Sequence, residues 1–288
     1  MIEAVLLRRS LWRAALGRLR ASRAAACASG LLLTLLLLAA LAPALSPYRY
    51  DQLDWQHLAA PPWSAGHWLG TDRLGRDLLV RVAYGTRLSL LLGLTASAIS
   101  VLIGIAWGAM AGYVGGRTDA LLMRTVDVLN SLPTLFLVIA LTSVIGRGSP
   151  GVLLLAVGAV GWLTLARIVR GQTLALRRRD FMLAALVSGA RTPHILARHV
   201  VPNVLGAVIA YAALTIPQIM LFESFLSFLG LGVQEPLASL GSLVRAGANE
   251  MESAPWMLLV PAAVLLTMLA SLSVLGDALR DALDPRAE

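Results

Sequence analysis

The sequence contains no lysine, only one cysteine and few charged residues, and each shortage excludes a class of protein. A P-loop needs a lysine to reach the nucleotide phosphates, and all 24 basic residues here are arginines, so we exclude a P-loop ATPase. Cys27 alone permits neither a disulfide framework nor a cysteine metal site. HExxH and GxSxG motifs are also missing. We therefore expect no catalytic residues.

The rest of the composition indicates a membrane protein. Hydrophobic residues make up 58% of the chain and charged residues 14%. A bilayer-spanning helix needs about 20 apolar residues, which predicts an all-α integral membrane protein with six transmembrane helices at 24–45, 88–111, 124–145, 151–170, 204–228 and 255–276. The first segment, with its basic start and leucine-rich run, could also be read as a signal peptide. An uncleaved helix is the simpler explanation, since five further spans follow.

The arginines predict the orientation of these helices. The net charge is +8, and 17 of the 24 arginines fall in residues 1–23, at the sequence end and in the loops after the second and fourth spans. Because cytoplasmic loops carry the excess of basic residues, we expect both termini to be cytoplasmic. No aromatic residues interleave with the arginines, which favours anionic lipid over nucleic acid as their surroundings.

These spans divide the chain into regions. We predict a cytoplasmic N-terminal basic segment at 1–23, a first transmembrane helix at 24–45, an extracytoplasmic segment at 46–86, and a five-helix core at 87–276 with a cytoplasmic loop at 177–203. A cytoplasmic tail at 277–288 follows. We also expect a short surface helix near 239–250.

Ionisable groups within the spans are candidates for transport chemistry. Asp127 lies one turn into the third span, where its carboxylate could instead pair with Arg117 or Arg124. Glu223 lies near the outer end of the fifth span, where backbone amides or a partner helix could satisfy it. Prolines within spans bend helices or loosen their hydrogen bonds. The candidate pathway or gating residues are therefore Asp127, Pro133, Pro217 and Glu223.

The loop at 177–203 is strongly basic and amphipathic. It predicts two short helices joined near Gly189, with Pro193 close to the start of the second helix and Pro202 ending it. Such an element suits docking on the cytoplasmic face. His194 and His199 are five residues apart, a spacing that does not place two ligands on one helical face. We read both as interface residues, and we expect no metal site.

Within this loop, Ala184-Ala185, three residues and Gly189, followed by Pro202, resemble the EAA loop of binding-protein-dependent ABC transporter permeases. The family pattern is Glu-Ala-Ala, three residues, Gly, nine residues and Ile-x-Leu-Pro; here Leu183, His199 and Val201 replace the Glu, Ile and Leu. The resemblance implies coupling helices that fit a groove on an ATPase subunit. The residues expected to make this contact are Arg179, Asp180, Ala184, Ala185, Gly189, Arg191, His194, Arg198 and Pro202.

Further motifs extend the resemblance to most of the chain. His67-Trp68-Leu69-Gly70-Thr71-Asp72 with Gly75-Arg76-Asp77 is similar to the outer signature of the peptide/nickel branch, as are residues 223–232 and 276–285. Residues 166–174 and 201–206 look most like the C-type subunits of oligopeptide permeases. The resemblance implies a type I ABC importer permease fold.

The same resemblance implies partners and a location. The implied partners are a second, B-type permease subunit that forms a heterodimer with this chain, two ABC ATPase subunits that carry ATP and Mg, and an extracytoplasmic peptide-binding protein. The implied location is the lipid bilayer of a bacterial inner membrane, which the chain crosses several times. This chain would bind no cofactor itself. Oligopeptides are the expected cargo, and dipeptides, glutathione or nickel chelates stay open. A different class, a secondary transporter driven by an ion gradient, predicts inverted repeats and a midplane ionic site, and we find neither.

Overall fold

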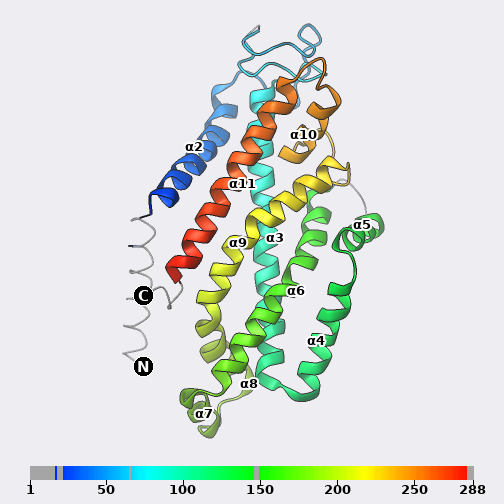
Figure 1. Cartoon of the computed structure of the whole chain (residues 1–288). Helices are drawn as coiled ribbons and strands as arrows, with labels where there is room; N and C mark the ends of the chain where they lie inside the picture. Colours follow the sequence, from blue (N-terminus) through cyan, green and yellow to red (C-terminus); the bar gives the residue numbers. More distant parts are fainter. Residues whose placement is uncertain (1–16, 18–21, 65, 146–148, 284–288) are drawn as a thin grey trace.

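The computed structural model describes residues 17, 22–64, 66–145 and 149–283. Most of the predicted basic segment 1–23, Arg147 and the last five residues lie outside the described residues. The described part is a bundle of long helices capped at one end by an irregular segment (Figure 1). The elements are α2 (Arg23–Leu45), α3 (Leu78–Val114), α4 (Gly116–Ser131), α5 (Thr134–Ile145), α6 (Pro150–Arg177), α7 (Asp180–Val187), α8 (Thr192–Ile195), the π-helical turn η1 (Leu196–Val200), α9 (Val201–Phe228), α10 (Leu240–Asn249) and α11 (Trp256–Leu283).

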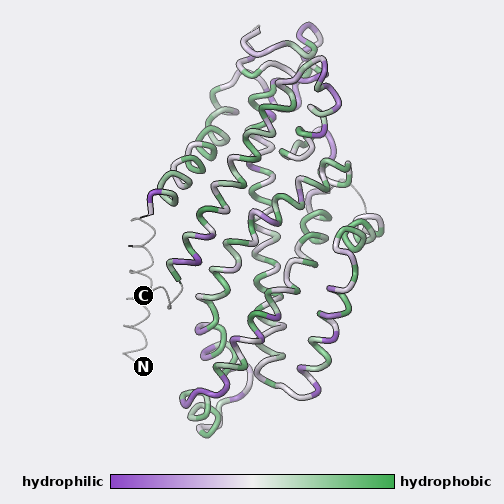
Figure 2. Tube along the Cα trace, in the orientation of Figure 1, coloured by the Kyte–Doolittle hydropathy of each residue, from purple (hydrophilic) through white to green (hydrophobic). Residues whose placement is uncertain are grey.

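Five of these helices are long and apolar enough to cross a membrane, and the number is six if the bent pair α4 and α5 is counted as one span. The prediction of an all-helical, multi-pass protein is thus confirmed. Hydrophilic residues gather at the two ends of the bundle, around the irregular segment and around α7, while the middle of the long helices is hydrophobic (Figure 2). This banding matches a hydrocarbon slab about 30 Å thick.

The third span differs from the expected continuous helix over 124–145. Its first half, α4, already starts at Gly116, and the chain bends by 92° before α5. Leu132 is extended (φ −80°, ψ 139°), because a residue before proline is driven out of the helical region. Pro133 therefore marks a break in this span. With 12 residues, α5 is only about 18 Å long and cannot cross the bilayer alone.

The helices α3 and α6 make the most extensive helix–helix contact of the described chain. Small residues four apart on α3 form the contact: Ala96, Ser100, Gly104, Gly108 and Gly112. At the three glycines an added Cβ would press on Leu165, on the backbone of Ala166, and on Thr173 of α6. Small residues at such spacing let helix backbones approach closely in a membrane.

The irregular segment, residues 46–77, is called the cap from here on. It precedes α3 and lies at the same end of the bundle as α10 (Figure 1). The expected short helix near 239–250 is present as α10, which begins with a capping box between Ser239 and Ser242. It does not simply lie on the surface, because it packs against α9 and α11 and only Arg245 and Asn249 of its residues are exposed. Both α9 and α11 continue through their internal prolines, Pro217 and Pro261.

Replacing Gly108 by alanine tests the α3–α6 contact. The new Cβ would overlap the carbonyl of Ala166, and such overpacking costs about 1–3 kcal/mol. We expect a lower melting temperature for the detergent-solubilised Gly108→Ala protein. Gly171→Ala is the matched control: this glycine is also helical, but no atom lies within 4 Å of its added Cβ, so alanine should be neutral or stabilising. Equal melting temperatures for both variants would contradict the packing argument.

Candidate coupling segment and buried polar networks

The predicted helix–Gly–helix element at 177–203 is present at the end of the bundle opposite the cap (Figure 1). The helix α7 ends in a Schellman motif: Gly189 N–H donates to Leu186 O (3.0 Å) and Ala190 N–H donates to Ala185 O (3.2 Å). Gly189 itself has φ +77°. Because no atom lies within 4 Å of its added Cβ, the requirement for glycine here is conformational and not steric.

Apolar anchors attach this segment to the bundle. Met182 of α7, Ile195 of α8 and Val200 of η1 are buried, with exposed fractions of 4% or less. They pack in one cluster with residues of α3, α6 and α9. These close-packed side chains therefore connect α7 and α8 to three long helices.

The outward face of the same segment combines apolar and basic side chains. Exposed apolar residues lie on α7, with Val187 at 88% the most exposed. Around them are arginines that pair with no carboxylate of the described residues. We call this the coupling face: Arg177, Arg178, Arg179, Phe181, Leu183, Leu186, Val187, Arg191 and Arg198. The predicted Asp180, Ala184 and His194 are exposed on it too, and Ala185 is partly buried.

Two details of the segment correct the predictions. Pro202 does not end the second helix; it occupies the first turn of α9, and the chain from Thr192 to Phe228 is one continuous helical span. The π-helical turn η1 directly precedes this proline, and local π-helical adjustment lets a membrane helix continue through a proline. The π-helical turn η1 also brings the rings of His194 and His199 to 6.2 Å between centroids, although a regular helix would separate residues five apart.

The candidate pathway residue Asp127 pairs with neither Arg117 nor Arg124. It accepts a hydrogen bond from Arg167 of α6 (2.8 Å), and both side chains are well exposed, at 62% and 45%. Nearby, Asp119 forms a two-fold pair with Arg170 of α6, with distances of 2.5 and 2.6 Å. These two ion pairs attach α4 to α6.

Glu223 is a buried junction of three helices. Its carboxylate accepts hydrogen bonds from Ser227 (2.8 Å) and from Ser89 of α3 (3.2 Å). The Ser89 hydroxyl also accepts the N–H of Leu240 at the start of α10 (3.1 Å). Serine hydroxyls, not the backbone amides we expected, thus satisfy this acid, together with the expected neighbouring helix.

The four candidate pathway residues do not form one constellation. Asp127 lies on α4 and Pro133 at the break after it, whereas Pro217 and Glu223 lie on α9. No hydrogen bond or ion pair in the described part of the chain joins the two pairs. Pro217 lines an open groove between α9 and α11, with Gln218, Ser273 and Asp277 among the other lining residues.

At the cap end, a buried ion network joins segments far apart in sequence. Asp72 accepts a hydrogen bond from Arg76 Nε (2.6 Å), and Arg81 Nε of α3 lies 3.4 Å from the same oxygen. Arg76 also donates to Glu235 in the α9–α10 loop (2.8 Å). Asp72, Arg76 and Arg81 are at most 5% exposed. Arg81 and Glu235 were missed by sequence reasoning, since only the fold brings them to Asp72.

Residues 67–77, the outer motif, form hydrogen bonds within the cap and at the start of α3. The Thr71 hydroxyl accepts the N–H of Ala60 (2.8 Å), and Asp77 caps α3 through the N–H of Val80 (2.9 Å). Gly75 has φ +76° and lies so close to Asp54 that a Cβ would overlap the Asp54 carbonyl. This part of the motif therefore has a structural role in closing the cap.

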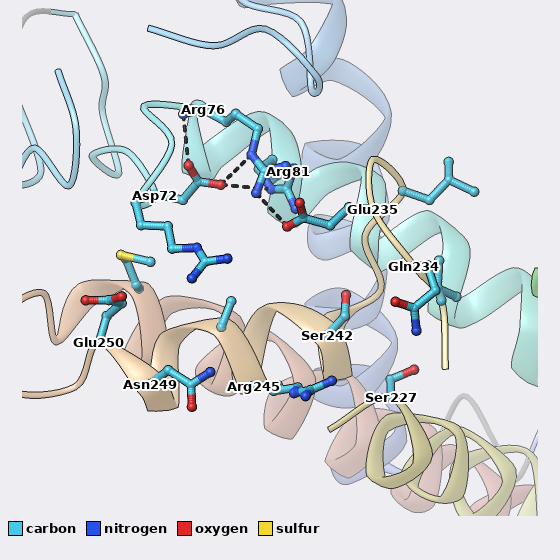
Figure 3. Close-up of a pocket in the computed structure, with 15 residues that line it drawn as sticks. Asp72, Arg76, Arg81, Ser227, Gln234, Glu235, Ser242, Arg245, Asn249 and Glu250 are labelled. Atoms are coloured by element: carbon cyan, nitrogen blue, oxygen red, sulfur yellow. Dashed lines mark hydrogen bonds and ion pairs between the residues drawn. The ribbon is translucent and has the colours of Figure 1, made fainter. Parts of the chain in front are cut away.

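A cavity of about 210 Å³ lies beside the ion network. Arg73 and Arg245 also line it, and neither pairs with a carboxylate of the described residues. No arrangement of nucleophile and base is present among the lining residues, so the cavity favours binding over catalysis. Figure 3 shows Asp72 beside Arg76 and Arg81, with Glu235 next to them. Ser242, Arg245 and Asn249 of α10, and Glu250 directly after it, lie along the opposite wall.

Comparison with known proteins decides the family. The family model described as "binding-protein-dependent transport system inner membrane component" matches residues 104–288, and so includes the coupling segment. The chain belongs to this family. A second model, "N-terminal TM domain of oligopeptide transport permease C", matches residues 10–62.

Similar permeases match over nearly the whole chain. The oligopeptide transport system permease protein OppC of Haemophilus influenzae is 47% identical, covering 96% of this chain and 89% of the relative. OppC of Escherichia coli K12 is 50% identical, covering 96% and 92%. The dipeptide transport system permease protein DppC of Bacillus subtilis is 42% identical, covering 96% and 84%. The predicted family is thus confirmed, and this permease is a transport subunit and not an enzyme.

The cap network gives the permease a testable pH dependence. The hydrogen bond from Arg76 lowers the pKa of Glu235, so this contact stabilises the fold above the ordinary glutamate pKa and is lost as pH falls through the lowered value. Because Glu235 is half exposed, Glu235→Gln should reduce stability at pH 7 by less than about 1 kcal/mol.

Thermal unfolding of both proteins between pH 7 and pH 3 would measure this difference, which should disappear in acid. Glu252→Gln, an exposed acid without an ion pair among the described residues, should match the wild type throughout. A difference that grew in acid would contradict the assignment.

Proposed function

We propose that this chain is the C-type permease subunit of an ATP-driven oligopeptide importer in a bacterial inner membrane, where it forms half of the translocation pathway. The observation that carries the proposal is the coupling face, combined with identities of 47–50% to permeases named for oligopeptide transport. The partners would be a B-type permease subunit, two ABC ATPase subunits with ATP and Mg, and an extracytoplasmic peptide-binding protein.

The arginines support placing the coupling face in the cytoplasm. The helices α2, α4–α5 and α9 run toward the cap end, and α3, α6 and α11 run away from it (Figure 1). The described ends of α2 and α11 therefore point away from the cap, and the segment that joins α6 to α9, with Arg177, Arg178, Arg179, Arg191 and Arg198, lies on that side of the bundle too. By the positive-inside rule, this side and both termini would be cytoplasmic and the cap extracytoplasmic.

The chemistry of the coupling face suits an ATPase groove. Exposed apolar side chains outside the hydrocarbon region mark a protein contact, and the unpaired arginines would complement an acidic rim, giving orientation more than affinity. Leu183 replaces the glutamate of the family pattern and is 52% exposed. We infer that apolar contact and shape, and not a glutamate ion pair, dominate this docking.

Transport would proceed by alternating access. ATP on the partner subunits can drive the change only if the two conformations differ in affinity for the nucleotide-bound ATPase. The anchors Met182, Ile195 and Val200 would carry the motion of α7 into α3, α6 and α9. Asp127, Pro133, Pro217 and Glu223 stay candidates for the pathway or its gating. The break at Pro133 and the groove at Pro217 favour a mechanical role for the two prolines.

Other cargo within the family stays an alternative, because the dipeptide permease of Bacillus subtilis is also similar; glutathione and nickel chelates belong to this alternative. An ion-gradient-driven carrier is not favoured. Such a carrier would use an ionic site within the membrane, whereas Glu223 is held by serine hydroxyls and Asp127 pairs with Arg167.

Reconstitution tests the function directly. We expect proteoliposomes with this permease, its B-type partner, the ATPases and the binding protein to accumulate labelled oligopeptides only when ATP is inside with the ATPases. Labelled dipeptide, glutathione and nickel under the same conditions would rank the cargo. Uptake that persists without ATP and collapses with the membrane potential would refute the importer.

Gly189 provides the test of coupling. Valine is strained at φ +77°, so Gly189→Val should disrupt the turn between α7 and α8 and reduce ATP-dependent uptake at least tenfold. Its amount in the membrane fraction should be unchanged, since no side chain contacts this position. Gly189→Asn is the control, because asparagine tolerates this conformation and should keep most of the uptake. Normal uptake by Gly189→Val would refute the coupling role.

A further inference from the structure

His67 in the cap has one ring nitrogen engaged and one without a partner. The side chain is 1% exposed, and Nδ1 lies 2.8 Å from Asp77 Oδ2. The other nitrogen, Nε2, is fully buried and makes no hydrogen bond. A buried polar atom without a partner is costly and needs an explanation. Neither the closing of the cap nor the proposed transport function uses this nitrogen.

Two further ligand atoms face the unpartnered nitrogen. Asp54 Oδ2 lies 3.8 Å from His67 Nε2, and His57 Nδ1 lies 2.8 Å from the same Asp54 oxygen. The three ligand atoms all lie within 4.8 Å of one another. Around a tetrahedral Zn²⁺ with bonds of about 2.0–2.1 Å, ligand atoms are about 3.3 Å apart. Side-chain adjustments of about an ångström would therefore close the site.

The hydrogen bonding of His67 prepares it as a ligand. When His67 Nδ1–H donates to Asp77 Oδ2, the neutral ring keeps a lone pair on Nε2, the atom that lies 3.8 Å from Asp54 Oδ2. Metal-bound histidines characteristically donate their second N–H to a carboxylate in this way. Asp77 is itself held in place, because its other oxygen caps α3 at Val80.

The surroundings hold the three residues while leaving an entrance. Tyr48 stacks on the His67 ring at 4.1 Å between centroids, and the turn at Gly75 packs against the Asp54 backbone. The side chains of Asp54 and His57 are 29% and 35% exposed, so an ion can enter from solvent and keep a water as its fourth ligand.

We propose that Asp54, His57 and His67 form a Zn²⁺-binding site, with Asp77 orienting His67, that fastens the cap over the start of α3. Two imidazoles and one carboxylate are a ligand set that Zn²⁺ favours. The site joins the first part of the cap, which follows α2, to the motif that precedes α3. It does not depend on the transport function proposed above, and its test requires no transport.

The test is zinc binding by the full-length permease, purified in detergent through a tag without histidine and stripped with a chelator. We expect one tightly bound Zn²⁺ per chain by elemental analysis after dialysis, and Co²⁺ should give the visible spectrum of a tetrahedral site. His57→Asn should weaken zinc binding by more than about 100-fold, and Asp77→Asn by about 10–100-fold. Zn²⁺ should raise the melting temperature of the wild type but not that of His57→Asn.

The chain provides matched controls for these variants. His194→Asn with His199→Asn removes the two histidines at the opposite end of the bundle and should leave zinc binding unchanged. His57 is partly exposed, so His57→Asn should fold; equal melting temperatures of the stripped proteins would verify this, with Asp54→Asn as a second ligand variant. The site would be overturned, leaving a hydrogen-bonded network only, if the wild type failed to bind zinc at micromolar concentration or if both ligand variants bound zinc as tightly as the wild type.

Discussion

The close approach of α3 and α6 is the constraint on which the rest of the structure depends. In a bilayer, helices gain little from burying apolar side chains against one another, because lipid is equally apolar, and packing of small residues replaces that driving force. The stripe from Ala96 to Gly112 supplies this packing. The first turn of α3 carries the cap, and α6 leads directly into α7. The contact between α3 and α6 thus fixes the distance between the cap and the coupling face.

A group of charged side chains is buried and paired at the cap end of the bundle, whereas those of the coupling face are exposed and unpaired within the described chain. At the cap end, Asp72, Arg76 and Arg81 are buried in a network that reaches Glu235. Removing one partner from such a network would leave an uncompensated buried charge, so these residues hold the cap in one arrangement. At the opposite end, the arginines of the coupling face remain exposed and unpaired within the described chain. One end uses its charges for its own fold, while the other leaves them available for the docking proposed above.

The sequence predicts those features that depend on residues close together in the chain, such as apolar spans and tight turns. Apolar length reveals the spans, and Gly189 is recognisable because only a residue tolerant of positive φ can complete the turn after α7. The partners of Asp127 and Glu223 were mispredicted in part, because tertiary packing selects Arg167 and Ser89 from other helices. Pro202 was misplaced because a local π-helical turn lets this membrane helix continue through the proline. The Arg76–Glu235 contact spans 159 positions, beyond the reach of any local pattern.

The exposed ion pair on α4 and α6 gives a last constraint on what surrounds this chain. Asp127 and Arg167 are 62% and 45% exposed, and Asp127 lies about three turns from the start of α4. Lipid cannot hydrogen-bond such groups, and intramembrane charges face a protein interior or a water-filled cavity. This exposed ion pair therefore makes water or another chain a more favourable neighbour than lipid for this face of α4 and α6. Both fit a subunit that lines half of a pathway and needs a second permease to complete it.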